Sequence, residues 1–290
     1  MTISAHLDST KRHDFVYLFD IHDGNPNGDP DNGNMPRTDP ETMHGLMTDG
    51  SLKRKIRDWV DMMHGTEERN KIYIQSKGIA LNDFHARAYT AKGITPIDSK
   101  QPAEDVAQVR SWMCENFYDV RMFGGVMNTK VNCGQVRGPV QMTFARSVDP
   151  ISPIDVTITR VAITKVGTDK TTEMGRKAIV PYALYRASGY YIPHFARQSG
   201  VDDDDLRIYW EALQSFWDID RSATRGTLAL RGIYIYTHQN PLGNGPAHRL
   251  LEKVSVEKKK SVPRSFEDYS ITIDSSVMPT GVTLTRLGVD

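Results

Sequence analysis

The sequence DFVYLFDIHDGNPNGDPDNGNMPRTD, residues 14–39, joins an apolar run to the part of the chain most dense in Asp, Asn, Gly and Pro. The run from Phe15 to Ile21 has the alternation typical of a β-strand. Asp, Asn, Gly and Pro are the residues that form turns. A helical pattern follows at 49–64, so the chain opens with the order strand, loop, helix.

The loop has three interpretations on its residues alone. Asp23, Asn25, Asn27 and Gly28 occupy the first, third, fifth and glycine positions of a calcium-binding loop. Its closing position holds Asn34 instead of a bidentate Glu, so a calcium site here would be weak. The same residues suit turns in which Asn and Gly adopt left-handed conformations, or a backbone-rich surface that approaches a polyanion.

The composition is that of a globular protein. The 290 residues are 39% hydrophobic, enough for a core in one decorated domain or two ordinary ones. No apolar run approaches the roughly 20 residues of a membrane helix, and the N-terminus lacks a signal peptide's apolar stretch. We therefore expect a cytoplasmic protein with no membrane partner. Cys114 and Cys133 are not at zinc spacing, so neither a disulfide framework nor a structural zinc site is expected.

The net charge is zero, with 36 basic and 36 acidic residues, which argues against a protein that coats nucleic acid indiscriminately. Basic residues nevertheless cluster at LKRKIR (52–57) and EKKKSVPR (257–264). The acidic run DDDD (202–205) is suited to the N-terminus of a helix. One face could bind phosphate while another stays acidic, or each cluster could be a solvated face.

The helix predicted at 49–64 is amphipathic. Arg54 has acidic neighbours at Asp58 and Asp61, so we expect it to be partly paired. Lys53 and Arg57 are then the freer cations along one margin of the helix. The buried stripe is predicted to consist of Leu52, Ile56, Trp59, Val60 and Met63.

The next part of the chain resembles an insertion. Residues 65–100 mix a predicted strand, KIYIQS (71–76), with Gly and Pro, and a predicted helix spans Ala103 to Phe117. DVRMFGG (119–125) then leads into a predicted strand from Val136 to Phe144. The two glycines of that motif let a backbone approach a ligand closely, or form a plain hairpin turn.

The second half of the chain supplies a long hairpin and the remaining secondary structure. IDVTITRVAITKVGTDKTTEMGRKAIV (154–180) predicts two strands with a polar tip, too long for a core element and suited to reaching a neighbour or a ligand. PYALYRASGYYI (181–192) predicts a strand, and a helix is expected from Asp203 to Trp217. TLALRGIYIYTH (227–238) predicts a last strand. The resulting β-α-β-β-α-β order fits an α+β, ferredoxin-like sheet with insertions.

Catalytic motifs are absent from the sequence. It contains no phosphate-binding loop of the G-x-x-x-x-G-K-[ST] type, no H-E-x-x-H and no G-x-S-x-G. His22 and His44 border the opening loop and have the side chain suited to proton transfer near neutral pH. The Asp-rich loop could instead hold a divalent ion that activates water.

Several blocks of the sequence resemble one known family. NPNGDPDNGNMPRTD followed by LKRKIRDWV, then DVRMFGG, GQVRGPVQMTFARS and VPYALYRASG, are similar to the CRISPR-associated Cascade backbone family, subtype I-C. The resemblance runs through nearly the whole chain. It implies a single decorated domain over 1–290: a modified RRM fold described as a hand, with a palm, a fingers insertion (65–118) and a protruding β-hairpin thumb (155–180).

The resemblance also implies that the chain binds guide RNA (crRNA) as a filament. Its partners would be copies of itself, a guide-end-capping subunit, a large subunit and the target DNA, with no cofactor. Guide-RNA contacts are implied for Asn25, Asn27, Gly28 and Arg37 in the loop, Lys53, Arg54 and Arg57 in the helix, and Phe123, Gly124, Gly125 and Arg137 beside it. Contacts at or near the thumb tip are implied for Lys165, Lys170, Met174, Arg176 and Lys177.

Two features bear on how RNA would be held. RGIYIYTH lacks the later aromatic positions of the RRM signature, so stacking of bases on an open sheet is not expected. The backbone protein of type III effectors is understood to cut RNA with a loop Asp and a metal ion, which keeps Asp23, Asp29 and Asp31 as candidates for a metal-dependent ribonuclease. The subtype I-C resemblance favours a non-catalytic subunit that recognises double-stranded DNA by base pairing of its guide.

Overall fold

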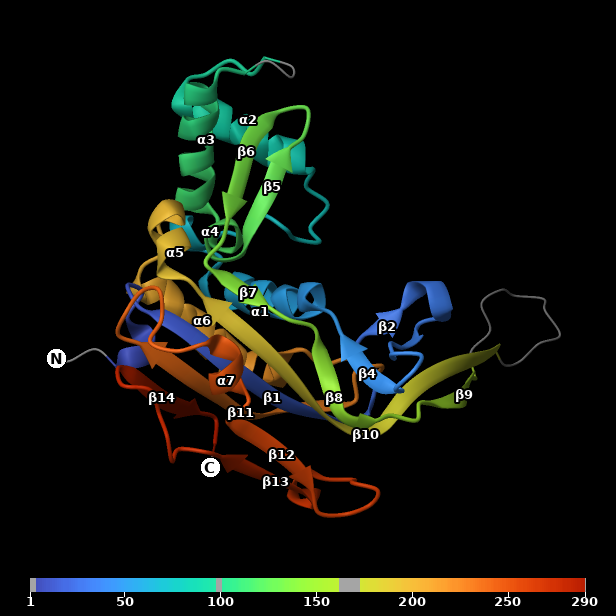
Figure 1. The fold of residues 1–290 in the computed structure, drawn as a ribbon. Coiled ribbons are helices and arrows are strands. Elements are labelled where there is room, and N and C mark those ends of the chain that lie inside the picture. The colour runs from blue at the N-terminus through green and yellow to red at the C-terminus, as the bar shows by residue number, and fades with distance from the viewer. Residues whose placement is uncertain (1–3, 98–100, 162–172, 290) are drawn as a thin grey trace, which may run out of the picture.

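A computed structural model describes residues 4–97, 101–161 and 173–289 of the chain. Its main feature is an eight-stranded sheet in which the strands follow the order β14-β11-β1-β10-β8-β4, while β7 and β9 pair with β10 outside this path (Figure 1). The strands of this sheet are β1 (Arg12–Gly24), β4 (His44–Met47), β7 (Val140–Met142), β8 (Ala145–Pro150), β9 (Ile154–Arg160), β10 (Glu173–Tyr191), β11 (Thr227–His238) and β14 (Val282–Leu287).

The central strand β1 is buried on both faces. It pairs antiparallel with β10 on one side and β11 on the other. Phe15, Tyr17 and Phe19 belong to the largest apolar cluster, whereas Val16 and Leu18 belong to a second cluster on the opposite face. The strand was predicted correctly, but the alternation expected of it was wrong: Phe15 to Phe19 are all buried, because each face of this strand meets a different part of the core.

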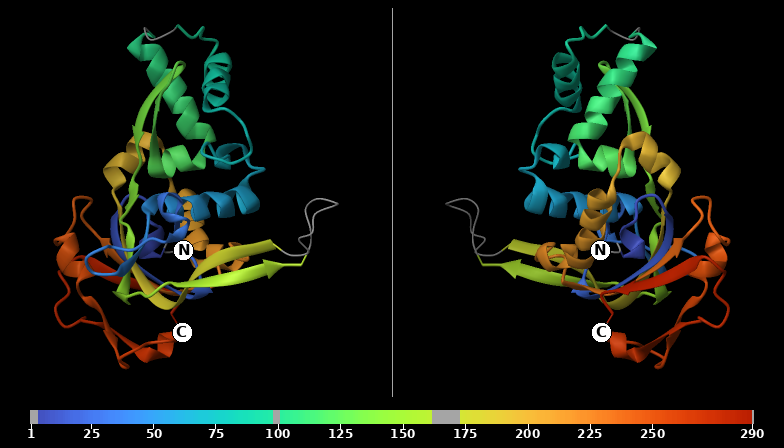
Figure 2. Two further views of the ribbon diagram at one scale, coloured as in Figure 1. Left: turned by 90° about the vertical axis from the view of Figure 1, so that its right-hand side faces the viewer. Right: turned by 90° about the vertical axis from the view of Figure 1, so that its left-hand side faces the viewer.

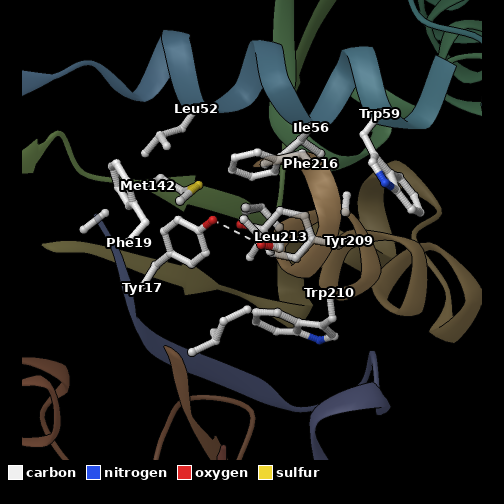
Figure 3. Packing of buried hydrophobic residues seen from close by; sticks show 14 of the residues in the cluster. Tyr17, Phe19, Leu52, Ile56, Trp59, Met142, Tyr209, Trp210, Leu213 and Phe216 are labelled. Carbon is white, nitrogen blue, oxygen red and sulfur yellow. Dashed lines mark hydrogen bonds between the residues drawn. The ribbon is translucent and has the colours of Figure 1, made fainter. Parts of the chain in front are cut away.

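Helices α1 (Asp49–His64) and α6 (Asp203–Ile219) cover one face of the sheet. Figure 3 shows Leu52 and Ile56 above Phe216 and Leu213, with the Tyr17 hydroxyl donating a hydrogen bond to the Leu213 carbonyl oxygen over 3.1 Å. Helix α1 has its predicted span, α6 ends two residues beyond the predicted Trp217, and four residues of the predicted α1 stripe are buried. Met63 was predicted wrongly: its side chain is 58% exposed, because the last turn of α1 extends past the sheet-covering core.

A smaller body lies above α1 in Figure 1 and has its own apolar core. It consists of α2 (Leu81–Lys92), α3 (Ala103–Asn116) and the hairpin of β5 (Gly124–Asn128) and β6 (Asn132–Arg137). The sequence predicted α3 but missed α2. Residues 71–76 were predicted wrongly as a strand, because the amides of Tyr73 and Ile74 donate to the Asp119 carboxylate instead of a neighbouring strand.

The short helix α4 (Tyr118–Phe123) joins the two bodies. The buried Arg121 side chain on α4 forms two hydrogen bonds to the Asp205 carboxylate at the start of α6. Asp202 accepts a hydrogen bond from the Asp205 amide, which confirms that the acidic run caps a helix. The cap therefore also supplies the carboxylate that ties the upper body to the sheet.

Three strand predictions need correction. Gly138 and Pro139 interrupt the strand predicted at Val136 to Phe144, because proline lacks a donor and Gly138 packs against the backbone at Phe123. The return strand of the long hairpin and the strand at 181–192 form one strand, β10, of 19 residues. Pro181 is tolerated inside it because β10 changes partner there, from β9 to β8.

The strand β11 is not the last strand. β14 adds to its free edge, and α7 (Ala247–Leu251) with the hairpin of β12 (Val254–Lys258) and β13 (Tyr269–Ile273) covers the face opposite α1. The remaining elements are α5 (Pro193–Ser199), β2 (Gly28–Asp29), β3 (Met35–Pro36), and the 3-10 turns at Ala5–Leu7, Pro30–Asn32, Glu68–Asn70 and Phe266–Asp268.

The strand β9 and the first part of β10 leave the sheet as an arm, which we define as Ile154–Arg160 with Glu173–Ile179 (Figure 2). All seven residues of β9 are exposed. Within the part of the chain that the structure describes, no helix combines the length and the apolar character needed to cross a bilayer.

Candidate nucleic-acid interface

The opening loop is held together by its own asparagines. Asn25 is 5% exposed, and its Nδ2 donates to the Asn34 carbonyl oxygen over 2.7 Å. The Asn27 Oδ1 accepts hydrogen bonds from the amide and the hydroxyl of Thr48, the residue that caps α1. Gly33 and Asn34 have left-handed φ angles of 57° and 61°, as the turn interpretation predicts. These side chains shape the loop and attach it to α1.

Gly28 and Arg37 have similar internal roles. A Cβ atom at Gly28 would lie 2.0 Å from the Asn34 Oδ1, so the glycine allows the loop to close on itself. The Arg37 guanidinium lies 3.3 Å from the Asp29 carboxylate and is 30% exposed. Among the described residues, no group of three or more His, Cys, Asp or Glu side chains is placed to hold a metal ion.

An anchor of this loop comes from a distant part of the sequence. The Arg225 guanidinium donates to the carbonyl oxygens of Pro26, over 2.6 Å, and Asn25, over 3.3 Å. Its Nε also lies 3.3 Å from the Asp220 carboxylate. Sequence reasoning missed Arg225, and no local pattern could have found it, since about 200 residues separate it from the loop in the chain.

The cations of α1 differ from their prediction. Lys53 pairs with Asp49 over 3.0 Å and Arg57 with Asp119 over 2.8 Å, and both side chains are only 13% exposed. Arg54 is 65% exposed, and its contact with Asp58 is longer, at 3.7 Å. The expectation that Lys53 and Arg57 are the freer cations is therefore wrong, because a tertiary contact and the helix's first turn supply carboxylates to them.

Phe123 lies beneath these two cations. Its ring centroid is 5.3 Å from the Arg57 guanidinium carbon and 5.9 Å from the Lys53 Nζ, distances typical of cation–π contacts. Gly124 has φ of 77°, and a Cβ there would lie 2.4 Å from the Val136 carbonyl oxygen. This glycine thus permits a close approach within the chain, whereas a Cβ atom at Gly125 would meet its nearest neighbour, the Met127 side chain, only at 4.0 Å.

The other predicted contact residues are more exposed. Arg137 stacks on the Phe195 ring at 4.2 Å and stays open to solvent. On the arm, Met174 and the side chain of Arg176 are 81% and 82% exposed, and Arg176 lies 3.5 Å from Asp155. Lys177 is half-buried, while Lys165 and Lys170 lie outside the described residues.

The two histidines near the loop each have a partner in the sheet. The His22 ring lies 4.6 Å from the Tyr182 ring, and its Nε2 lies 3.8 Å from the Asp20 carboxylate. Burial raises the pKa of Asp20 above its usual value, although Arg231 and Tyr182 act in the opposite direction. His44 contacts the Ser147 carbonyl oxygen through Nδ1.

The sequence of this chain matches one protein family over most of its length. Residues 11–274 fit the family described as CRISPR-associated protein Cas7. The chain belongs to the Cas7 family. Family membership agrees with the resemblance seen in the sequence, at the level of the family.

Two comparisons place this Cas7-family chain among known proteins. A protein of Haloferax volcanii described as CRISPR-associated protein Cas7 is 30% identical over 123 residues, which cover 42% of this chain and 34% of the relative. The chain thus aligns with about a third of that relative's length. A chain of a solved structure described as a CRISPR RNA-guided surveillance complex, pre-nicking, has 16% identity and a TM-score of 0.50, with 78% of each chain covered. This likeness shows a shared fold.

Proposed function

We propose that this chain is the guide-RNA-binding backbone subunit of a type I-C Cascade effector. Copies of it polymerise along the crRNA, between a guide-end-capping subunit and a large subunit. The protein holds the sugar-phosphate path, and base pairing of the guide recognises double-stranded target DNA. Membership of the Cas7 family supports a role in a CRISPR effector complex. The fold shared with a chain of an RNA-guided surveillance complex supports the same class of complex.

The observation that carries the polymerisation is the arm. Its apolar side chains Ile154, Val156 and Ile158 are 48%, 38% and 51% exposed, so its own domain leaves them uncovered. Exposed aliphatic residues gathered on a projecting hairpin are typical of a surface that a partner covers. A filament supplies that partner, because each copy presents its arm to the next.

The sheet supports a hand-like interpretation of the fold. The order β11-β1-β10-β8, with α1 and α6 on one face, matches a ferredoxin-like palm. The body built from α2, α3 and the β5–β6 hairpin then corresponds to the fingers, and the arm to the thumb. Under this proposal the fingers extend past residue 118, because β5 and β6 contribute Met127 and Cys133 to the core of that body.

The exposed cations are the best candidates for RNA phosphates. Arg54 on α1 and Arg176 on the arm are both largely exposed, and each lies at a long distance from its carboxylate partner, 3.7 Å for Arg54 and 3.5 Å for Arg176. A phosphate can displace such a partner at little cost, since exposed pairs stabilise a protein by only about 0 to 1 kcal/mol. Lys53 and Arg57 would affect RNA binding indirectly, by holding Phe123 and α1 in place.

The proposed subunit has no catalytic role. Asp23 and Asp31 are exposed, and Asp29 is engaged by Arg37. RNA incubated with the pure protein and Mg²⁺ or Mn²⁺ should stay intact. Cleavage that is abolished by Asp23→Ala or Asp31→Ala would replace this proposal by a metal-dependent ribonuclease.

The main test is to purify the protein from its native host and sequence the nucleic acid that accompanies it. Discrete repeat-derived RNAs, bound by several copies of the protein, are the expected result. A monomer free of nucleic acid would overturn the proposal.

A further inference from the structure

An arginine-lined cleft lies where the smaller body meets the sheet. It has a volume of about 600 Å³ and opens between α3, β6 and α5. Arg110 of α3, Arg137 of β6 and Arg197 of α5 all line it. Each side chain comes from a different element, so only the folded chain gathers them.

These three arginines have no carboxylate partner among the described residues. Most of the other cations that the structure describes do have one: Arg37, Lys55 and Arg57, for example, each lie within 4.0 Å of an Asp side chain. In a chain with as many acidic as basic residues, unpaired guanidinium groups meeting in one cleft leave it positively charged. Such a site attracts an anion from outside the chain.

The acidic and paired groups at the cleft do not cancel this charge. Glu115 is the one carboxylate among its lining residues, and it already accepts a hydrogen bond from the Ser111 hydroxyl and lies 3.8 Å from the Lys92 Nζ. A fourth lining cation, Arg69, is held by Asp202 and Asp205 and is therefore neutralised.

Arg137 is held in place before any ligand binds. Its guanidinium stacks on Phe195 at 4.2 Å, and among the described residues no acceptor takes a hydrogen bond from its N–H edge. The next residue, Gly138, packs so closely on the backbone at Phe123 that a Cβ atom would lie 2.2 Å from it. The strand end that carries Arg137 is thus fixed by backbone contact, and less entropy is lost when its donors bind an anion.

The chemistry of the lining favours phosphate over an acidic polypeptide. Planar guanidinium groups form paired hydrogen bonds with phosphate and with carboxylate oxygens alike, so the rest of the lining decides between the two. Interfaces with nucleic acid are polar and positive, whereas protein interfaces depend on buried aromatic or apolar anchors. The cleft offers Ala107, Val136 and the mostly buried Cys114 as its apolar lining, with no aromatic residue.

We infer that the cleft between Arg110, Arg137 and Arg197 binds the phosphodiester backbone of a nucleic-acid strand, apart from the contacts proposed for α1 and the arm. The inference rests on the proposed function, in which guide RNA and target DNA are both present. Either strand could supply the phosphates. The choice is left to the experiment.

The test compares the full-length double variant Arg110→Gln/Arg197→Gln with the wild type. The matched control is Arg249→Gln, which removes an exposed arginine outside this cleft that has no carboxylate partner in the described part of the chain either. Binding of labelled single-stranded RNA, single-stranded DNA and duplex DNA is measured by anisotropy over a range of salt concentrations. Thermal melting checks that each variant is folded.

We expect the double variant to lose at least about tenfold in affinity for one of the three probes, which corresponds to about 1.4 kcal/mol. For a single strand, the slope of log K against log salt should fall by about 1.4, because each lost phosphate contact removes about 0.7. A loss confined to RNA assigns the cleft to the guide, and a loss confined to DNA assigns it to the target. Arg137→Lys keeps the positive charge but loses the planar pair of N–H donors, so this variant should also bind that probe more weakly.

Two results would overturn the inference while the proposed function stands. In the first, the wild type binds the probes and the double variant binds every probe with the same affinity as the Arg249→Gln control. The other is unchanged nucleic-acid binding combined with lost association between copies, which would assign the cleft to an acidic surface of a neighbouring copy. Failure of the wild type to bind any probe would instead contradict the proposed function itself.

Discussion

The Arg57 Nε donates a hydrogen bond to the Asp119 Oδ2 over 2.8 Å, and this contact joins α1 to α4. Asp119 is 1% exposed, and its carboxylate also accepts hydrogen bonds from the backbone amides of Tyr73 and Ile74. The Asp119 carboxylate therefore binds both the Arg57 side chain and the backbone of residues 73–74, which form no strand. The sequence suggests that Arg57 binds phosphate, whereas in the fold Arg57 neutralises the buried charge of Asp119.

Arg57→Ala should therefore act mainly on stability. Removing one partner of a buried pair leaves the other charge uncompensated, and we expect a loss of about 3 kcal/mol in the free energy of unfolding, measured by urea denaturation. Asp119→Asn should also destabilise the fold. An Arg57→Ala variant that unfolds like the wild type but loses RNA affinity would mean that Arg57 is a phosphate ligand after all.

Arg54→Ala should show the opposite behaviour. Its side chain is 65% exposed, so its removal should change the free energy of unfolding by less than about 0.5 kcal/mol. Affinity for RNA should fall for every sequence alike, and the salt slope should drop by about 0.7 for one lost phosphate contact. Arg249→Ala is the matched control. An unchanged slope, with altered sequence preference, would exclude Arg54 as a phosphate contact.

Stability should decrease at mildly acidic pH because of His13. Its buried ring contacts the Thr237 hydroxyl and the Asp8 carbonyl oxygen, and burial lowers its pKa to about 4. The unfolded chain, with a His pKa near 6.5, takes up a proton first as the pH falls, so stability is lost between about pH 6.5 and 4. The loss attributable to His13 reaches about 3 kcal/mol, by the cost of about 1.4 kcal/mol per pKa unit.

Urea denaturation at several pH values measures this effect. His13→Gln should be less stable at pH 7, since it disturbs two hydrogen bonds, but its stability should depend less on pH between 7 and 4. Replacement of the exposed His248 by Gln serves as the control and should leave the pH dependence of the wild type. Burial also lowers the pKa of His6 and His85, so some acid sensitivity should remain. Equal pH dependence in His13→Gln and wild type would contradict the assignment.

Two substitutions on the arm separate assembly from folding. Val156→Lys with Ile158→Lys should leave the melting temperature nearly unchanged, because both side chains are exposed. Cooperative binding to a long RNA should be lost, since charge replaces the apolar surface offered to the next copy. Electron microscopy and titration of long RNA measure this. Thr157→Lys, on the other face of the same strand, is the control, and an equal loss in both variants would argue against a docking face at 156 and 158.

Long periodic segments could be predicted from the sequence with little error. The helix at 49–64 and the strand at 227–238 have the predicted bounds, because their apolar spacing reports directly on a buried face. The helix α2 was missed because its apolar face is weakly patterned and packs only against the small core of the upper body. The KIYIQS segment has the composition of a strand, yet two of its backbone amides donate hydrogen bonds to Asp119, which is more than 40 residues away in the chain.

By itself the sequence determined the opening strand, the turn residues of the loop, the amphipathic helices and the resemblance to a guide-RNA-binding family. Which cations are free to meet a phosphate was decided only by the tertiary structure. Ion pairing depends on distance in space, and partners such as Asp119 for Arg57 are 62 residues apart. Arg110, Arg137 and Arg197 have no common pattern in the sequence, and they line one cleft because α3, β6 and α5 meet there.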